Sequence, residues 1–300
     1  MRTRLMDFGI RVLALTLLAA VTACAPAAPD GAPAGNADAA VEGARGEGAD
    51  ATPRAVIVDQ LSLTVPNPDF VADATERLEA AGYTVDYFPG EEVTVEAYRG
   101  LPAAGYDFVL LRVHSARLLE GEELGDDVAL FTGELIDLRK FAVGGVPEGA
   151  ATAVAEELER LGGAVDATGR ERFTPEDFAH LVPAVFTVEG AELPFFGLRP
   201  GYVRERFEGR FKDGAIVVLM GCDGLRSPAL AEAFVDRGVS TFVSWDEPVL
   251  ATHTDEATLA LLERLLAGGE GGAAPADAIA AVNEAMGPDP QTGARLTLYP

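Results

Sequence analysis

Residues 215–222 of this chain read AIVVLMGC, a continuous apolar run that ends in a cysteine. Two earlier stretches have the same character: residues 55–59 read AVIVD, and residues 106–114 read YDFVLLRVH. Apolar runs without polar alternation are typical of strands that are buried on both faces, as in parallel sheets. These three stretches therefore predict the central strands of a parallel sheet.

The segments around these strands have the patterns of helices and further strands. Residues 67–82 carry apolar side chains at helical spacing and end in Gly82. We expect Ser227 and Thr252 to cap two more helices. The remaining predicted elements are helices 228–237, 253–267 and 275–286 and strands 83–88, 239–245 and 295–299. This alternation predicts an α/β fold, a mostly parallel sheet with helices on both faces.

Residues 123–212 interrupt the alternation. They contain a predicted strand at 128–135, a helix at 150–161 and a hairpin-like stretch at 184–196. We interpret this segment as an α+β insertion within one domain that covers residues 54–300.

The composition excludes several classes of protein. Lys and Arg total 23 against 48 Asp and Glu, which gives a formal net charge of -25. This balance argues against binding to nucleic acid, because phosphate recognition needs clustered basic residues. The two cysteines, Cys24 and Cys222, are too few for a disulfide scaffold. We also expect no cofactor and no metal, and we interpret the acidic residues near His253 as a solvated surface: Asp246, Glu247 and Asp255.

The amino terminus has the pattern of an export signal. A basic start precedes the apolar run VLALTLLAAVTA at residues 12–23, which is too short to cross a membrane. Residues 21–24 (VTAC) resemble a bacterial lipobox, which implies cleavage before Cys24 and lipid attachment to its sulfur. Residues 24–53 are mostly Ala, Pro, Gly and acidic residues and predict a disordered tether. We therefore expect an exported lipoprotein that is anchored through Cys24 on the extracytoplasmic face of a membrane.

Polar side chains end several of the predicted strands. Functional groups collect at the carboxyl ends of strands in open parallel sheets. Here those ends are Asp59, His114, Cys222 and the pair Trp245–Asp246. If the strands before His114 and Cys222 are neighbours, an imidazole and a thiol reach the same edge, where the imidazole can activate the thiol.

These motifs resemble the caspase-like cysteine peptidases, a clan that includes metacaspases, clostripain and bacterial CHAT domains. The resemblance rests on the strand that ends in His114, on Gly221–Gly224 (GCDG) and on Ser244–Pro248 (SWDEP). It covers about residues 54–122 and 213–268, and it implies a three-layer α/β sandwich.

The resemblance also implies roles for individual residues. His114 would be the general base and Cys222 the nucleophile that attacks a peptide carbonyl. The Cys222 amide and a donor near Ser115 would form the oxyanion hole. The clan usually has Gly where this chain has Ser115, and Ala or Ser where it has Gly221.

A substrate-binding role is implied for the segment after the last parallel strand. Caspases have an Arg after the Trp of this segment, whereas this chain has Asp246 after Trp245. A carboxylate there, reinforced by Asp223, favours cleavage after Arg or Lys. Two alternative functions are also consistent with the sequence. One is a catalytically inactive binding or scaffold module at the cell surface, and the other is a different thiol hydrolase or transferase that uses the same pair.

Overall fold

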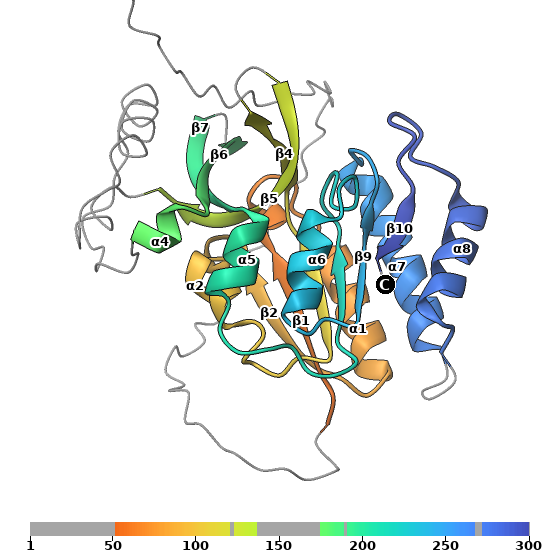
Figure 1. The fold of residues 1–300 in the computed structure, drawn as a ribbon. Helices are drawn as coiled ribbons and strands as arrows, with labels where there is room; N and C mark the ends of the chain where they lie inside the picture. The colour runs from red at the N-terminus through yellow and green to blue at the C-terminus, as the bar shows by residue number, and fades with distance from the viewer. Residues whose placement is uncertain (1–51, 121–122, 137–174, 189–190, 268–271, 300) are drawn as a thin grey trace, which may run out of the picture. The chain divides into compact units, whose positions relative to one another are not determined.

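The computed structural model describes residues 52–120, 123–136, 175–188, 191–267 and 272–299 (Figure 1). The predicted signal peptide (1–23), the lipid-attachment residue Cys24, most of the predicted tether (24–53) and the predicted helix 150–161 lie outside these ranges. Among the described residues, no helix is both long enough and apolar enough to cross a membrane.

The larger sheet has six strands in the order β10-β9-β8-β3-β1-β2. Five of them are parallel, and β10 runs antiparallel to β9 at one edge. The predicted α/β class with a mostly parallel sheet is confirmed. The strands are β1 (Arg54–Asp59), β2 (Thr84–Pro89), β3 (Phe108–Arg112), β8 (Ile216–Leu219), β9 (Thr241–Trp245) and β10 (Leu296–Tyr299).

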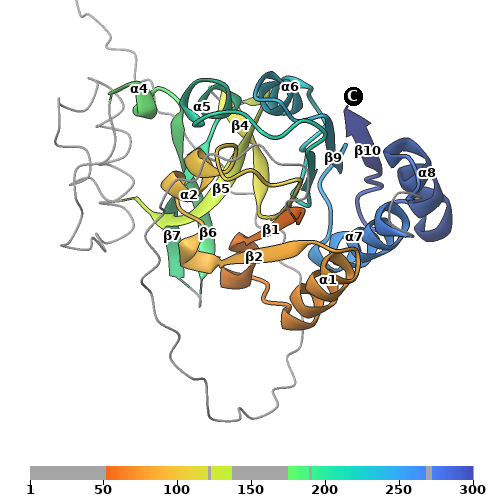
Figure 2. The same cartoon turned by 90° about the horizontal axis from the view of Figure 1, so that it is seen from below.

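Helices cover both faces of this sheet. Successive residues of each strand point to opposite faces, so each strand contributes side chains to two separate clusters. Val56 and Val58 belong to one buried cluster with α2, α5 and α6, while Ala55 and Ile57 belong to another with α1, α7 and α8. Figure 2 shows α1 and α7 on one side of the strands and α5 and α6 on the other. The helices are α1 (Pro68–Ala80), α2 (Val95–Gly100), α5 (Pro200–Arg206), α6 (Ala229–Asp236), α7 (Ala251–Leu266) and α8 (Pro275–Met286).

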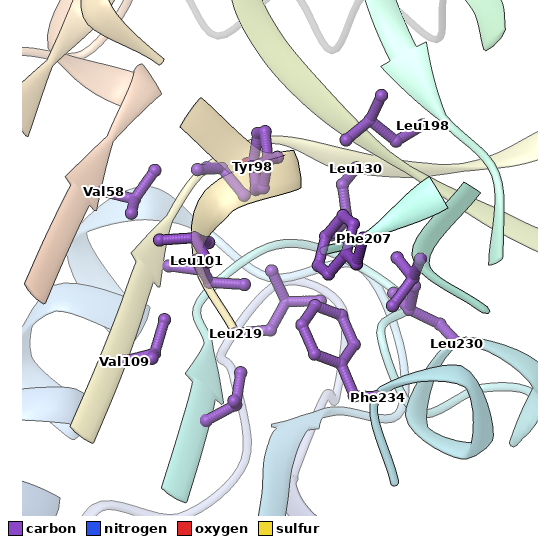
Figure 3. Packing of buried hydrophobic residues seen from close by; sticks show 14 of the residues in the cluster. Val58, Tyr98, Leu101, Val109, Leu130, Leu198, Phe207, Leu219, Leu230 and Phe234 are labelled. Atoms are coloured by element: carbon purple, nitrogen blue, oxygen red, sulfur yellow. The ribbon is translucent and has the colours of Figure 1, made fainter. Parts of the chain in front are cut away.

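The core on the α6 side also joins the larger sheet to a second sheet. Val109 and Leu219 from the larger sheet share a buried cluster with Phe234 of α6 and with Leu130 and Leu198 (Figure 3). The last two residues belong to the second sheet. Burial of one such side chain stabilises the fold by about 1.5–3 kcal/mol, so this cluster holds the two sheets together.

The second sheet is antiparallel, with strand order β4-β5-β7-β6. Its strands are β4 (Ser115–Glu120), β5 (Glu123–Leu135), β6 (Leu181–Val188) and β7 (Ala191–Leu198), and α4 (Pro175–Phe178) precedes β6. The predicted strand 128–135 and the predicted hairpin are confirmed. The sheet begins at Ser115, however, before the expected start of the insertion near residue 123, because β4 follows β3 after only two residues.

Of the two predicted helix caps, the one at Thr252 is wrong. The residue before α6 is Pro228, and the Ser227 hydroxyl accepts the Ala229 amide at the start of this helix over 3.4 Å. Thr252, in contrast, lies inside α7, which follows Leu250. The Leu250 amide donates to Oδ2 of Asp289, 2.9 Å away. A carboxylate that is distant in the sequence therefore satisfies the start of α7, and no local hydroxyl is needed there.

Candidate active site

His114 and Cys222 lie beyond the ends of two neighbouring parallel strands. Leu111 of β3 pairs with Leu219 of β8, and the Met220 amide continues the ladder by donating to the Leu111 carbonyl, 2.9 Å away. His114 and Cys222 each come three residues after this pair. The strands are thus neighbours, as the prediction required, and both residues follow the carboxyl edge of the sheet.

Ser115 and Gly221 hold the two strand extensions together. The Ser115 hydroxyl donates to the Cys222 carbonyl over 2.6 Å. A Cβ at Gly221 would overlap Ser115 Oγ and lie 2.6 Å from the Val113 carbonyl oxygen, so no side chain fits there. Close backbone approach therefore explains a glycine at the position before Cys222.

The His114 side chain is surrounded by aromatic and hydroxyl groups. Its ring centroid lies 6.1 Å from that of Phe131 and 5.6 Å from that of Phe186. Its Nε2 atom is 3.0 Å from the hydroxyl of Thr64. Burial, together with the nearby positive charge of Arg112, lowers the pKa of His114 to about 4. The imidazole is therefore neutral at neutral pH.

The thiol of Cys222 is held by the backbone of Val249. The Val249 amide donates to Sγ over 3.4 Å, and the thiol donates to the Val249 carbonyl over 3.6 Å. Burial raises the pKa of Cys222, the Val249 amide opposes this, and the charges of Asp223 and Asp289 add to the rise. Cys222 is accordingly a protonated thiol at neutral pH.

The expected bond between the imidazole and the thiol is not formed in this structure. Among the described residues, the hydrogen-bond partners of the two side chains are Thr64 for His114 and Val249 for Cys222. The structure therefore brings the two residues to one edge of the sheet, in neutral forms and without direct contact.

The Cys222 amide makes no hydrogen bond within the described residues. The amides of Met220 and Asp223 are both used, since Met220 N–H donates to the Leu111 carbonyl and Asp223 N–H donates to the Glu247 carbonyl. Within the described part of the chain, no acceptor faces the Cys222 N–H. An unpaired amide beside a nucleophile is the donor that an oxyanion requires.

Trp245 and Asp246 support the fold in this structure. Trp245 is buried, with 1% of its surface exposed, and its Nε1 donates to the Thr254 hydroxyl. Asp246 Oδ1 accepts the Arg295 amide over 2.7 Å, next to the pairing of β9 with β10. Trp245 thus offers no surface to a substrate, and the Asp246 carboxylate already has a partner.

Asp223 differs from Asp246 because its carboxylate is poorly satisfied. It is 7% exposed, and its φ of 59° places it in the left-handed region, which few residues other than glycine adopt. Within the described residues, its Oδ1 is buried without a hydrogen bond, and the nearest cation is Arg226 at 4.0 Å. Burial raises the pKa of Asp223. Of the two acidic residues predicted for substrate binding, it is the one adjacent to Cys222 with free hydrogen-bonding capacity.

Several residues around the site were not predicted from the sequence. Gln60 accepts the His114 amide, while Thr64 and Val249 contact the two candidate catalytic side chains. A buried ion cluster lies behind them, in which the Arg112 guanidinium binds the carboxylates of Asp59 and Asp255. A charge inside the apolar run of β3 was the available signal for this cluster, because a buried Arg requires acidic partners.

Comparisons with known proteins identify no family for this chain. No family model matches the chain, and no curated protein matches it.

Proposed function

We propose that this protein is an exported, lipid-anchored cysteine endopeptidase of caspase-like fold. The observation that carries the proposal is the placement of His114 and Cys222 after the neighbouring, in-register strands β3 and β8. Both residues are partly exposed at this edge of the sheet.

The proposed reaction begins with Cys222 and His114 in their neutral forms. Cys222 Sγ attacks the peptide carbonyl carbon while its proton passes to His114, and the Cys222 amide stabilises the oxyanion. His114 then protonates the leaving amine, and water hydrolyses the thioester. A neutral imidazole suits the first step because it is the form that accepts a proton.

Attack requires the thiol to leave Val249. Both contacts of the sulfur are long, at 3.4 and 3.6 Å, and sulfur is a weak donor and acceptor. Their weakness lets the thiol turn from Val249 toward a carbonyl carbon that is bound at the Cys222 amide. The contacts of the thiol with Val249 are therefore compatible with a resting enzyme whose nucleophile moves toward the substrate when the substrate binds.

The proposed cleavage site follows Arg or Lys, with Asp223 rather than Asp246 as the main acidic determinant. Asp223 directly follows the nucleophile and has a buried oxygen atom without a hydrogen bond among the described residues. A basic side chain would be attracted by the negative charge of the Asp223 carboxylate, which favours Arg or Lys before the scissile bond.

The test is a peptide-library cleavage assay on the full chain. Wild-type protein is expected to cleave after basic residues, and Cys222→Ala and His114→Ala are each expected to abolish cleavage. Cleavage that survives in Cys222→Ala comes from a contaminant, and absence of cleavage by the wild type argues against the proposal.

A second candidate is a catalytically inactive module of the same fold that binds proteins at the cell surface. It is favoured by the backbone contacts of the Cys222 thiol and by the Thr64 partner of His114. In that case the wild type and His114→Ala bind the same peptides with equal affinity, and neither cleaves them.

A further inference from the structure

The segment between β9 and α7, residues 246–250, carries the backbone that contacts the Cys222 thiol. The Val249 amide lies 3.4 Å from Sγ, and the Val249 carbonyl oxygen lies 3.6 Å from it. Contacts of this kind to sulfur are weak. They hold the thiol only if the backbone of Val249 is itself fixed, so the contacts of this segment decide how firmly the thiol is held.

The loop between α8 and β10, residues 287–295, binds the segment at both ends. At one end, Asp246 Oδ1 accepts the Arg295 amide, and the Asp246 amide donates to the Arg295 carbonyl over 3.2 Å. At the other end, the Leu250 amide donates to Asp289 Oδ2 over 2.9 Å. Since Leu250 directly follows Val249, Asp289 fixes the chain one residue away from the backbone that contacts the thiol.

Asp289 is also fixed within its own loop. Its Oδ1 accepts the amides of Gln291 and Thr292 over 2.8 and 3.0 Å. Its own amide donates to the Ala294 carbonyl over 2.9 Å, and the residue is buried. The carboxylate therefore serves three backbone amides, of which only the Leu250 amide belongs to another segment.

A carboxylate suits this position because all three partners are donors. Burial opposes the ionisation of Asp289, but the three amides outweigh it and lower its pKa, so the side chain is charged at neutral pH. An asparagine has one acceptor oxygen and an NH₂ group that only donates. With its oxygen on Gln291 and Thr292, it would turn the NH₂ group toward the Leu250 amide. Asp289→Asn therefore removes the contact with Leu250 while it keeps the turn.

We infer that Asp289 is a positioning residue for Cys222: through the Leu250 amide it fixes Val249 and so keeps the thiol in its resting contacts. The inference concerns the state of the thiol and does not depend on peptidase activity. If the peptidase proposal is correct, this is the hold from which the sulfur must turn before it attacks.

The experiment measures the rate at which iodoacetamide alkylates Cys222 in the full chain, from mass spectra of the Cys222 peptide. Asp289→Asn removes the acceptor of the Leu250 amide. Leu250→Pro removes the amide and leaves the charge of Asp289, and proline fits there because the φ of Leu250 is -70°. Asp277→Asn is the matched control, because Asp277 is an exposed carboxylate in the first turn of α8.

The rate is measured against pH up to its plateau, where the thiol is fully ionised. Burial, the Val249 amide and the charges of Asp223 and Asp289 all act on the pKa of Cys222, and the plateau is independent of that pKa. The plateau is expected to rise about tenfold in both Asp289→Asn and Leu250→Pro, which corresponds to the loss of one hydrogen bond. It is expected to stay at the wild-type value in Asp277→Asn.

An unchanged plateau in either Asp289→Asn or Leu250→Pro overturns the inference. A plateau equal to that of the same chain in urea also overturns it, because the variant is then unfolded, and circular dichroism checks this. Peptide cleavage by the wild type is scored separately. If the plateau rises as expected and no peptide is cleaved, the positioning role stands and the peptidase proposal fails. If peptides are cleaved and the plateau is unchanged, only the inference fails.

Discussion

At Cys222, burial and two neighbouring carboxylates act on the thiol in the same direction. Each raises its pKa, so the thiolate fraction at neutral pH is smaller than for an ordinary cysteine with a pKa of about 8.5. Because the thiolate is the form that reacts, alkylation of Cys222 by iodoacetamide is expected to be slower in the folded chain than in urea at the same pH. Mass spectrometry of the Cys222 peptide measures both rates. A faster rate in the folded chain that His114→Ala removes would instead reveal a preformed thiolate–imidazolium pair.

The pH dependence of cleavage follows from His114. The reaction needs the neutral ring, and burial with the nearby Arg112 lowers its pKa to about 4. Since a lowered pKa extends the neutral form to lower pH, kcat/KM is expected to hold its value as the pH falls to 5. It should then decrease through about pH 4. Circular dichroism at each pH checks that the chain stays folded, and a decrease centred near the ordinary value of about 6.5 would contradict this environment for His114.

Asp223 and Asp246 are expected to respond differently to mutation. Asp223→Asn should lower kcat/KM for peptides with Arg before the scissile bond about 10-fold to 100-fold more than for peptides with Gln there, because it removes the charge. Asp246→Ala should change both peptides equally, because its carboxylate binds the Arg295 amide. Selective loss of Arg cleavage in Asp246→Ala, with none in Asp223→Asn, would assign the specificity to the other carboxylate.

At the scale of elements, the packing of the β3 and β8 extensions depends on Gly221. Gly221→Ala is expected to destabilise the fold by about 1–3 kcal/mol, because the new Cβ would overlap Ser115 Oγ and crowd the Val113 carbonyl. Gly100→Ala is the matched control: nothing lies within 4 Å of its Cβ position, and it ends helix α2 without a positive φ. Urea unfolding of both variants measures the difference. Equal stability of the two variants would show that the extensions are not packed so closely.

The sequence predicted the central strands and long helices because each has a repeated local pattern. Elements without such a pattern were missed: α2 and α5 are short, and the six residues of β4 include two charges. The Thr252 cap was wrongly predicted because Asp289, far away in the chain, supplies the acceptor. Local patterns thus identify an element, while contacts between distant segments determine where it ends.

In the candidate site too, local patterns could be predicted from the sequence, whereas contacts between distant segments could not. That His114 and Cys222 reach a common edge could be predicted, because both follow buried strands and those strands are neighbours. Their hydrogen-bond partners could not be predicted, since Thr64 and Val249 lie outside helices and strands, in segments whose course depends on tertiary contacts. Asp246 was given a substrate role by its place in a motif, and only the position of β10 reveals its partner.

At the scale of the whole molecule, the proposed anchor is tested separately from the folded domain. Cys24→Ser is expected to release the protein from membranes, because the acyl chains on this residue would supply nearly all of the membrane affinity. The strongly acidic chain gains little from anionic head groups. Fractionation before and after a salt wash measures the release, with Cys222→Ser as the matched cysteine control. Retention of Cys24→Ser in washed membranes would contradict the lipobox interpretation.

One consequence follows from the short connection between the two sheets. Only Val113 and His114 separate the end of β3 from the start of β4. Two residues are too few to form a flexible loop. Any change in the angle between the two sheets therefore rotates the backbone at these residues. Cys222 follows β8, and its carbonyl is bound by the hydroxyl of Ser115 at the start of β4. The rigidity of this connection therefore sets the position of the imidazole relative to the thiol, and a loosened second sheet would misalign the two side chains.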